Sequence, residues 1–192
     1  MAPDGSGVPG QNSARTAARE QALAQLDDPD RLARIGALED ILNSQDAILI
    51  DFALRKVLVS TDQEMKSTAL RKLIANPKRA FVFTIESCGA TLGWSEQAMA
   101  DMCRNHANLL SGAVPLYFDN VDQATGQFMV HSSYSRVASP GKVQGTSLNF
   151  AIDLASRASQ DCFGRTSLTA DGALVGALSC SGLIFSGRID LF

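Results

Sequence analysis

A sixteen-residue period is the feature of this chain that most limits how it can fold. Four polar residues recur at that spacing, and each precedes a segment with helical periodicity: Asp28, Ser44, Ser60 and Asn76. Because an α-helix has 3.6 residues per turn, sixteen residues would rotate the apolar face of one continuous helix by about 160°. The period therefore predicts separate short helices stacked side by side.

The same apolar pattern, Ala-Leu-x-x-(Ile/Val/Leu)-(Leu/Ile), occurs in step within residues 37–42, 53–58 and 69–74. We expect helices over about residues 14–26, 29–43 and 46–59, and a fourth that follows a capping box at Ser60 or Thr61 and ends at Ala75, with breaks within two residues of the four polar positions. Pro77 supports the last break, because the residue before a proline avoids the helical region. Leu38, Leu54 and Leu70 occupy equivalent places, and we expect all three to be buried.

The repeated Ala-Leu pattern and its phased breaks resemble the HEAT-type α-solenoid repeats over residues 22–76. That resemblance implies a scaffold that binds other proteins, not an enzyme. Residues 80–192 resemble no family known to us.

The periodicity changes after residue 79, where apolar residues begin to alternate. Phe81, Phe83 and Ile85 fall on one face of an expected strand, and a helix is expected over 96–110. From Ala113 on, about six short strands with glycine-rich turns indicate an antiparallel sheet, a sandwich or a partial barrel. We expect a turn region at 141–145, a strand over 166–170, and two separate last segments over 183–185 and 188–192. An alternative is a sheet covered by the 96–110 helix. The fold class is α+β, with an array of short antiparallel helices over 14–76 and a mainly antiparallel β unit with one covering helix over 80–192.

Asp171-Gly172 is the best hairpin signal, because Asp-Gly suits a two-residue type I′ turn. Such a turn sets Leu168 opposite Val175 and places Cys162 one residue out of register with Cys180. Side chains alternate between the faces of a sheet, so that register predicts free thiols. All four cysteines are expected to be reduced.

Charge and composition exclude some functions. A net charge of −3 and a pI of about 5.3 argue against general nucleic-acid binding. No apolar run approaches the length that spans a membrane. Residues 1–13 lack the pattern of a secretory signal, and we expect a disordered arm and a cytoplasmic protein, with secretion by a non-classical route left open.

The candidate site residues are few. Cys103 and His106 share a helix face at i and i+3, a spacing that suits a metal or an activated thiolate. The further ligands are missing and methionines flank the pair, so we interpret both residues as structural, with no metal or cofactor. His131 and Ser133 are interpreted as polar residues on the wet face of a strand.

A second candidate is a small basic ridge on the stacked helices, formed by repeated Arg-Lys pairs: Arg55, Lys56, Arg71 and Lys72. The expected function is a non-enzymatic module that binds a protein partner or assembles as a homo-oligomer. The alternatives are a small enzyme or ligand carrier with a pocket between the helical and β units, and a structural subunit of a larger assembly.

Overall fold

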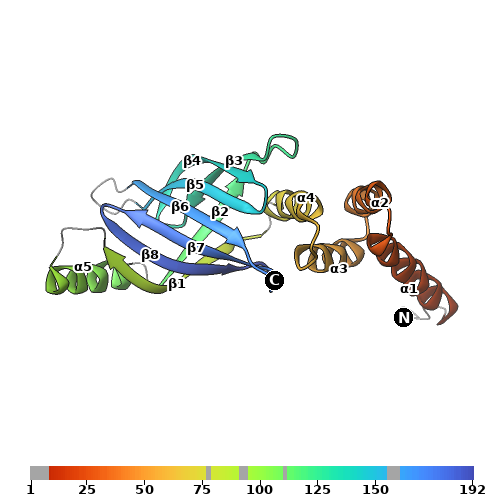
Figure 1. The fold of residues 1–192 in the computed structure, drawn as a ribbon, viewed down its shortest axis with the longest axis horizontal. Helices are drawn as coiled ribbons and strands as arrows, with labels where there is room; N and C mark the ends of the chain where they lie inside the picture. Colours follow the sequence, from red (N-terminus) through yellow and green to blue (C-terminus); the bar gives the residue numbers. More distant parts are fainter. Residues whose placement is uncertain (1–8, 77–78, 91–94, 110–111, 155–160) are drawn as a thin grey trace, which may run out of the picture. The chain divides into compact units, whose positions relative to one another are not determined.

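The computed structural model describes residues 9–76, 79–90, 95–109, 112–154 and 161–192 (Figure 1). Contacts within the chain divide it into two units, residues 1–57 and 58–192. This division falls inside a helix, whereas the sequence-based boundary at 76–80 marks a change of periodicity. Most of the expected disordered arm, residues 1–8, lies outside the described residues, and the first helix begins at Pro9, earlier than residue 14.

The N-terminal helices end where the sixteen-residue period predicts. The elements are α1 (Pro9–Ala24), the 3₁₀ helix η1 (Gln25–Asp27), α2 (Arg31–Asn43), α3 (Ala47–Leu58) and α4 (Gln63–Ile74). Each gap between them lies within two residues of an expected break, so that prediction is confirmed. Leu38, Leu54 and Leu70 are all buried, with relative exposures of 1%, 5% and 0%.

An aspartate two residues after each of the first three breaks forms the start of the next helix. Before α4, Asp62 accepts hydrogen bonds from the backbone N–H groups of Glu64 and Met65, and the Ser60 hydroxyl accepts the N–H of Asp62. The arrangement recurs before α2 and α3: Asp30 follows Asp28, and Asp46 follows Ser44. These side chains satisfy N–H groups that the helix itself leaves unpaired. The period therefore reflects a repeated capping device.

Eight strands of the described residues form a closed antiparallel barrel in sequence order (Figure 1). They are β1 (Phe81–Ala90), β2 (Ala113–Asp119), β3 (Gln127–Ser132), β4 (Ser135–Gln144), β5 (Ser147–Asp153), β6 (Asp161–Leu168), β7 (Ala173–Cys180) and β8 (Leu183–Asp190). β1 pairs with both β2 and β8, which closes the sheet. The α+β class with an antiparallel sheet is confirmed. The HEAT-type resemblance is wrong, because the larger unit is a closed barrel and not an array of helix pairs.

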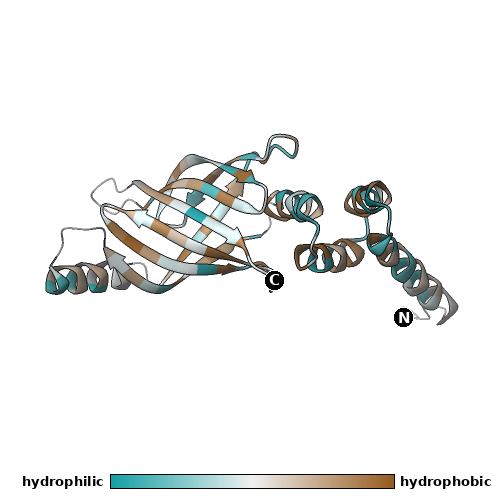
Figure 2. Ribbon diagram, in the orientation of Figure 1, coloured by the Kyte–Doolittle hydropathy of each residue, from teal (hydrophilic) through white to brown (hydrophobic). Residues whose placement is uncertain are grey.

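Inward-facing side chains fill the barrel. Phe81, Phe83 and Phe185 are essentially inaccessible to solvent. The apolar positions alternate with polar ones along the strands, which Figure 2 shows as bands of contrasting colour on each strand. An eight-stranded barrel is just wide enough for side chains to occupy its centre, and this interior is a packed core.

Two glycines make room for aromatic rings inside the barrel. Gly141 pairs with Phe128, and a Cβ on Gly141 would lie 2.1 Å from that ring. Gly164 pairs with Phe150 in the same way, and its Cβ would lie 2.2 Å from that ring. The rings of the neighbouring strands thus occupy the space that glycine leaves free.

From Ala113 on, the described residues form seven strands where we expected about six, and two of them, β4 and β8, differ from the expectation. Residues 141–145 were expected as a turn region, but Gly141 lies within β4 and the turn is confined to Gly145 and Thr146. The last two segments form one strand, β8, because Gly187 continues the pairing with both β1 and β7. The turn was expected because proline and glycine at 140–141 are typical turn residues. In the structure, Gly141 instead leaves space for the ring of Phe128.

The predicted hairpin register is wrong by one residue. Thr169 N–H donates to the Ala173 carbonyl, so the loop has three residues and ends at Gly172, whose φ is +81°. Leu168 therefore faces Leu174, and Cys162 directly faces Cys180. Both cysteines point into the core with Cα atoms 4.4 Å apart, and they form a disulfide. The prediction of two free thiols is overturned.

Candidate binding groove on the barrel

A groove of about 1010 Å³ crosses the outside of the barrel from β3 to β8. It lies wholly within the barrel unit. Its position follows from strand register, because residues that pair across successive strands form continuous rows on the barrel surface. Two outward-facing rows form its walls, and the backbone between them forms its floor.

The first row, which we call the apolar wall, carries mainly apolar side chains. Its members are Met129, Pro140, Ala151, Phe163, Ser179 and Ile184, one from each strand from β3 to β8. Phe163 is 64% exposed, a large apolar surface for a side chain on a sheet. An exposed aromatic side chain beside other apolar groups is typical of a binding surface.

The second row, the polar wall, lies two residues along each strand from the first. Its members are Gln127, Lys142, Asn149, Arg165 and Ala177. Positions two residues apart on a strand are separated by about 7 Å, which sets the spacing between the walls. Lys142 and Arg165 are exposed, and in the described part of the chain neither takes part in an ion pair. Their positive charges are therefore available to a ligand.

The floor is the backbone of the positions between the walls: Phe128, Gly141, Phe150 and Gly164. Their side-chain positions face the interior, where the rings of Phe128 and Phe150 lie against the two glycines. The packing of the core and the shape of the groove therefore depend on the same four residues.

One end of the groove is held by a turn between β2 and β3. Asp122 accepts hydrogen bonds from the N–H groups of Ala124 and Thr125 and from the Thr125 hydroxyl. The Thr125 hydroxyl, followed by these backbone donors, lowers the pKa of Asp122 below its ordinary value. Arg71 of α4 donates to the carbonyls of Gln123 and Ala124 at 3.0 and 2.9 Å. Asp122 thus stabilises a turn through its side chain.

A polar cluster lies beside this end, on the outer face of β2 and β3. His131 Nδ1 lies 3.1 Å from Asp119 Oδ2, and the imidazole stacks on Tyr117 with ring centroids 5.1 Å apart. Asp119 pairs with Met129 of the apolar wall. A carboxylate that orients an imidazole is a component of many hydrolytic sites. In the described residues, however, no hydroxyl or thiol is hydrogen-bonded to His131, so a nucleophile is missing.

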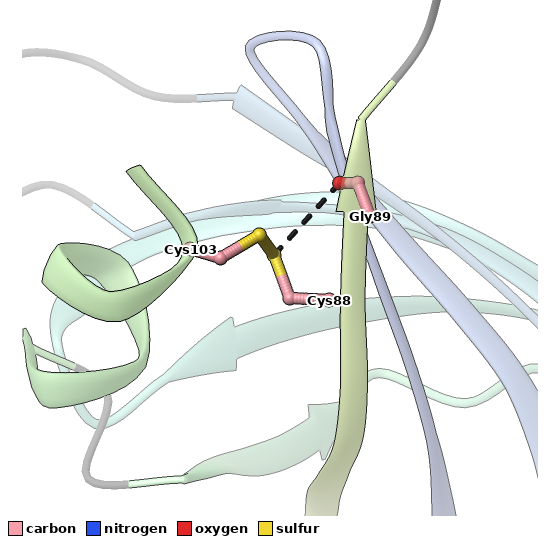
Figure 3. Close-up of a disulfide and its surroundings, with 3 residues drawn as sticks. All are labelled: Cys88, Gly89 and Cys103. Atoms are coloured by element: carbon pink, nitrogen blue, oxygen red, sulfur yellow. Dashed lines mark hydrogen bonds between the residues drawn. A yellow bond between two sulfur atoms is a disulfide. The ribbon is translucent and has the colours of Figure 1, made fainter. Parts of the chain in front are cut away.

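Cys103, the first sequence candidate, forms a disulfide with Cys88 (Figure 3). The bond joins α5 (Glu96–Leu109) to β1, with Cα atoms 5.8 Å apart. A disulfide sulfur has no thiolate to bind a metal or attack a substrate, which removes Cys103 from that role. Cys88 Sγ lies 3.8 Å from the Gly89 carbonyl oxygen, a contact and not a hydrogen bond, because the sulfur carries no proton. The side chain of His106 lies outside the described residues.

α5 was expected to cover the sheet. Figure 1 shows it at one end of the barrel, beside the end of β1. Within the described residues, no group of three or more His, Cys, Asp or Glu side chains is placed to hold a metal ion.

Three of the four residues of the expected basic ridge have partners inside their own units. Arg55 pairs with Asp51 at 2.8 Å, and Lys56 pairs with Asp27 at 2.5 Å. Arg71 holds the β2–β3 turn, and Lys72 is half-buried. A continuous ridge formed by these residues stays a prediction.

The residues of the groove were not identified as candidate site residues from the sequence. Lys142 fell in an expected turn, and the strand that contains Phe163 and Arg165 was expected to begin only at Thr166. The alternation Cys162-Phe163-Gly164-Arg165-Thr166 was the signal for a longer strand. Gly164 obscured it, because glycine resembles a turn residue.

Searches of protein-family models, curated proteins and solved structures found no match to this chain. The resemblance to HEAT-type repeats therefore has no support from a family model, in addition to the contrary evidence of the barrel. In the part of the chain that the structure describes, no helix has the length and apolarity needed to cross a membrane.

Proposed function

We propose that this chain is a non-enzymatic module that binds a protein partner through the outer groove of its barrel. The observation that carries the proposal is the pairing of two walls with different chemistry, one apolar with an exposed Phe163 and one with the exposed cations Lys142 and Arg165. Interfaces combine aromatic anchors with arginine in this way.

Two other modes of binding have less support. The barrel interior is filled by core side chains such as Phe83 and Leu148, which argues against a ligand carried inside. Each described strand pairs with a neighbour on both sides, so the closed barrel offers no edge strand to which a partner could add a strand along its whole length. Both points direct recognition to the side chains on the outside.

Site-specific photo-crosslinking tests this proposal. A benzophenone amino acid at position 163 should capture a discrete partner in the cells that naturally make the chain. Val137 of β4 is the matched control, because it is 60% exposed and lies outside the groove. Equal capture at both positions, or none at 163, would contradict binding through the groove.

A small enzyme or ligand carrier is the second candidate. The Asp119–His131 pair is the observation that favours it. An enzyme that used this pair as a base would lose activity in a His131→Gln variant while the groove stayed intact. A structural subunit of a larger assembly would instead show light scattering that rises with protein concentration.

We also propose that the chain functions in an oxidising compartment. The cytoplasmic expectation stays untested, but Cys88–Cys103 and Cys162–Cys180 both form disulfides, which persist outside reducing environments. Fractionation of the source cells, with detection of the oxidised chain, tests this proposal. Recovery only of reduced chain from cytosol would contradict it.

A further inference from the structure

We infer that the occupant of the groove is an extended polypeptide segment in which apolar and acidic side chains alternate. This inference rests on the proposed function and specifies which class of protein segment the groove recognises. It follows from the shape of the groove, from the chemistry of its two walls and from the direction in which it crosses the strands.

The dimensions of the groove favour an extended chain over a helix. It crosses six strands, and five intervals of about 4.8 Å give a length of about 24 Å. The two walls lie two residues apart along each strand, so they are separated by about 7 Å. One extended backbone fits between walls at that spacing, whereas a helix with its side chains is about 10 Å wide.

The groove also suits a macromolecule better than a small ligand. Small-molecule sites usually enclose most of the ligand surface. Here Phe163 is 64% exposed on one wall, and Lys142 and Arg165 are exposed on the other. A length of about 24 Å accommodates about seven residues of extended chain at 3.4 Å each.

The two walls determine the side-chain pattern of that segment. Successive side chains of an extended chain point to opposite sides, so a segment along the groove directs one set to each wall. The apolar wall offers Phe163, Met129 and Ile184 to apolar side chains. The polar wall offers Lys142 and Arg165, one strand apart on either side of Asn149, to carboxylates.

The spacing of the two cations fits this pattern. Lys142 and Arg165 lie on β4 and β6, which places their backbones about 10 Å apart. Acidic side chains at alternate positions of an extended segment are about 7 Å apart. The long side chains of lysine and arginine span the difference, and Asn149 between them is available to hydrogen-bond the peptide backbone.

Binding of synthetic peptides to the full chain tests the inference. The probe is a fluorescein-labelled peptide of about eight residues in which valine and glutamate alternate, measured by fluorescence polarisation. One comparison peptide replaces every glutamate by lysine. Another has the valine and glutamate composition of the probe at helical spacing. We expect saturable binding of the alternating glutamate peptide and much weaker binding of both others.

Variants of the polar wall give the second readout. Arg165→Ala should weaken binding of the glutamate peptide about tenfold, because it removes a charge-assisted hydrogen bond. Arg104→Ala is the control with the same change of net charge, since Arg104 is exposed on α5, outside the groove. Phe163→Ala, also at an exposed position, should weaken the same peptide. Circular dichroism should show that all three variants remain folded.

The results separate this inference from the proposed function. Equal affinity for the glutamate and lysine peptides, tighter binding of the helical peptide, or equal loss in Arg165→Ala and Arg104→Ala would overturn it. Failure of every peptide to bind would also overturn it. If position 163 nevertheless crosslinks a partner in cells, the groove binds protein but not an extended acidic segment. Absence of that crosslink refutes the proposed function itself.

Discussion

Substitution of Gly164 by alanine tests whether the glycine–phenylalanine packing inside the barrel is real. The new Cβ would lie 2.2 Å from a carbon of the Phe150 ring, and the three nearest ring atoms all lie within 2.7 Å. Carbon atoms in contact are separated by about 3.5–4.0 Å, so the ring must move by about 1.5 Å. Phe150 is only 4% exposed, and its neighbours leave little room for that movement.

The expected cost is the difference of two effects. Overpacking of a tight core destabilises a protein by about 1–3 kcal/mol. Alanine also restricts the unfolded chain, which stabilises the folded state by about 0.4–1 kcal/mol where the backbone conformation suits it. Gly164→Ala should therefore lower the free energy of unfolding by about 1–2 kcal/mol.

Urea unfolding followed by near-ultraviolet circular dichroism, which reports on the aromatic core, measures this cost. Gly89→Ala is the control, because a Cβ there meets no atom within 4 Å. Combining Gly164→Ala with Phe150→Leu should cost less than the two single changes added together, since the smaller side chain relieves the clash. If Gly164→Ala and Gly89→Ala differ by less than about 0.5 kcal/mol, the packing argument is wrong.

Three further predictions concern the helices and disulfides. Leu38→Ala and Leu70→Ala should each cost about 2–5 kcal/mol in thermal or urea unfolding, whereas Leu32→Ala, at a position 75% exposed, should cost under about 0.5 kcal/mol. Alkylation without reductant should modify no cysteine, and mass spectrometry showing alkylated Cys162 would refute the Cys162–Cys180 pairing. Removing the Cys162–Cys180 bond should lower the free energy of unfolding by about 2–4 kcal/mol. Hydrogen bonds, first from the Arg19 side chain and then from the Leu49 backbone, hold the pKa of Asp46 below its ordinary value of 3.8. The ionised Asp46 carboxylate therefore stabilises the fold above pH 3.8, and this stabilisation is lost as the pH falls through the lowered pKa. An Asp46→Asn variant that loses stability as steeply as the parent below about pH 4 would contradict this.

The parts of the fold that sequence predicted depend on local signals. The helix breaks follow from residues close together in the chain, and they were correct to within two residues. Even there the true caps were Asp30, Asp46 and Asp62, two positions later than the residues that define the period. The aspartates share the same spacing, so the period alone does not distinguish the two sets.

Closure of the barrel could not be predicted from such signals. β1 pairs with β8 about a hundred residues away, and no feature of either strand identifies its partner. The groove could not be predicted either, because its walls depend on the register of six strands. An error of one residue in the length of the loop at Ala170–Gly172 placed Cys162 out of register with Cys180 in our prediction. The same error would have placed residues of each wall on opposite faces of the sheet.

The floor and the walls of the groove should respond differently to substitution. Gly141 and Gly164 shape the outer floor because they accommodate Phe128 and Phe150 inside, so any side chain added there changes the core first. Phe163, Lys142 and Arg165 point outward and are exposed, so their truncation leaves the core untouched. A binding specificity located in the walls therefore has freedom to vary without loss of the barrel, whereas the floor is constrained by folding. The fold thus separates the residues that make the groove from those that select its ligand.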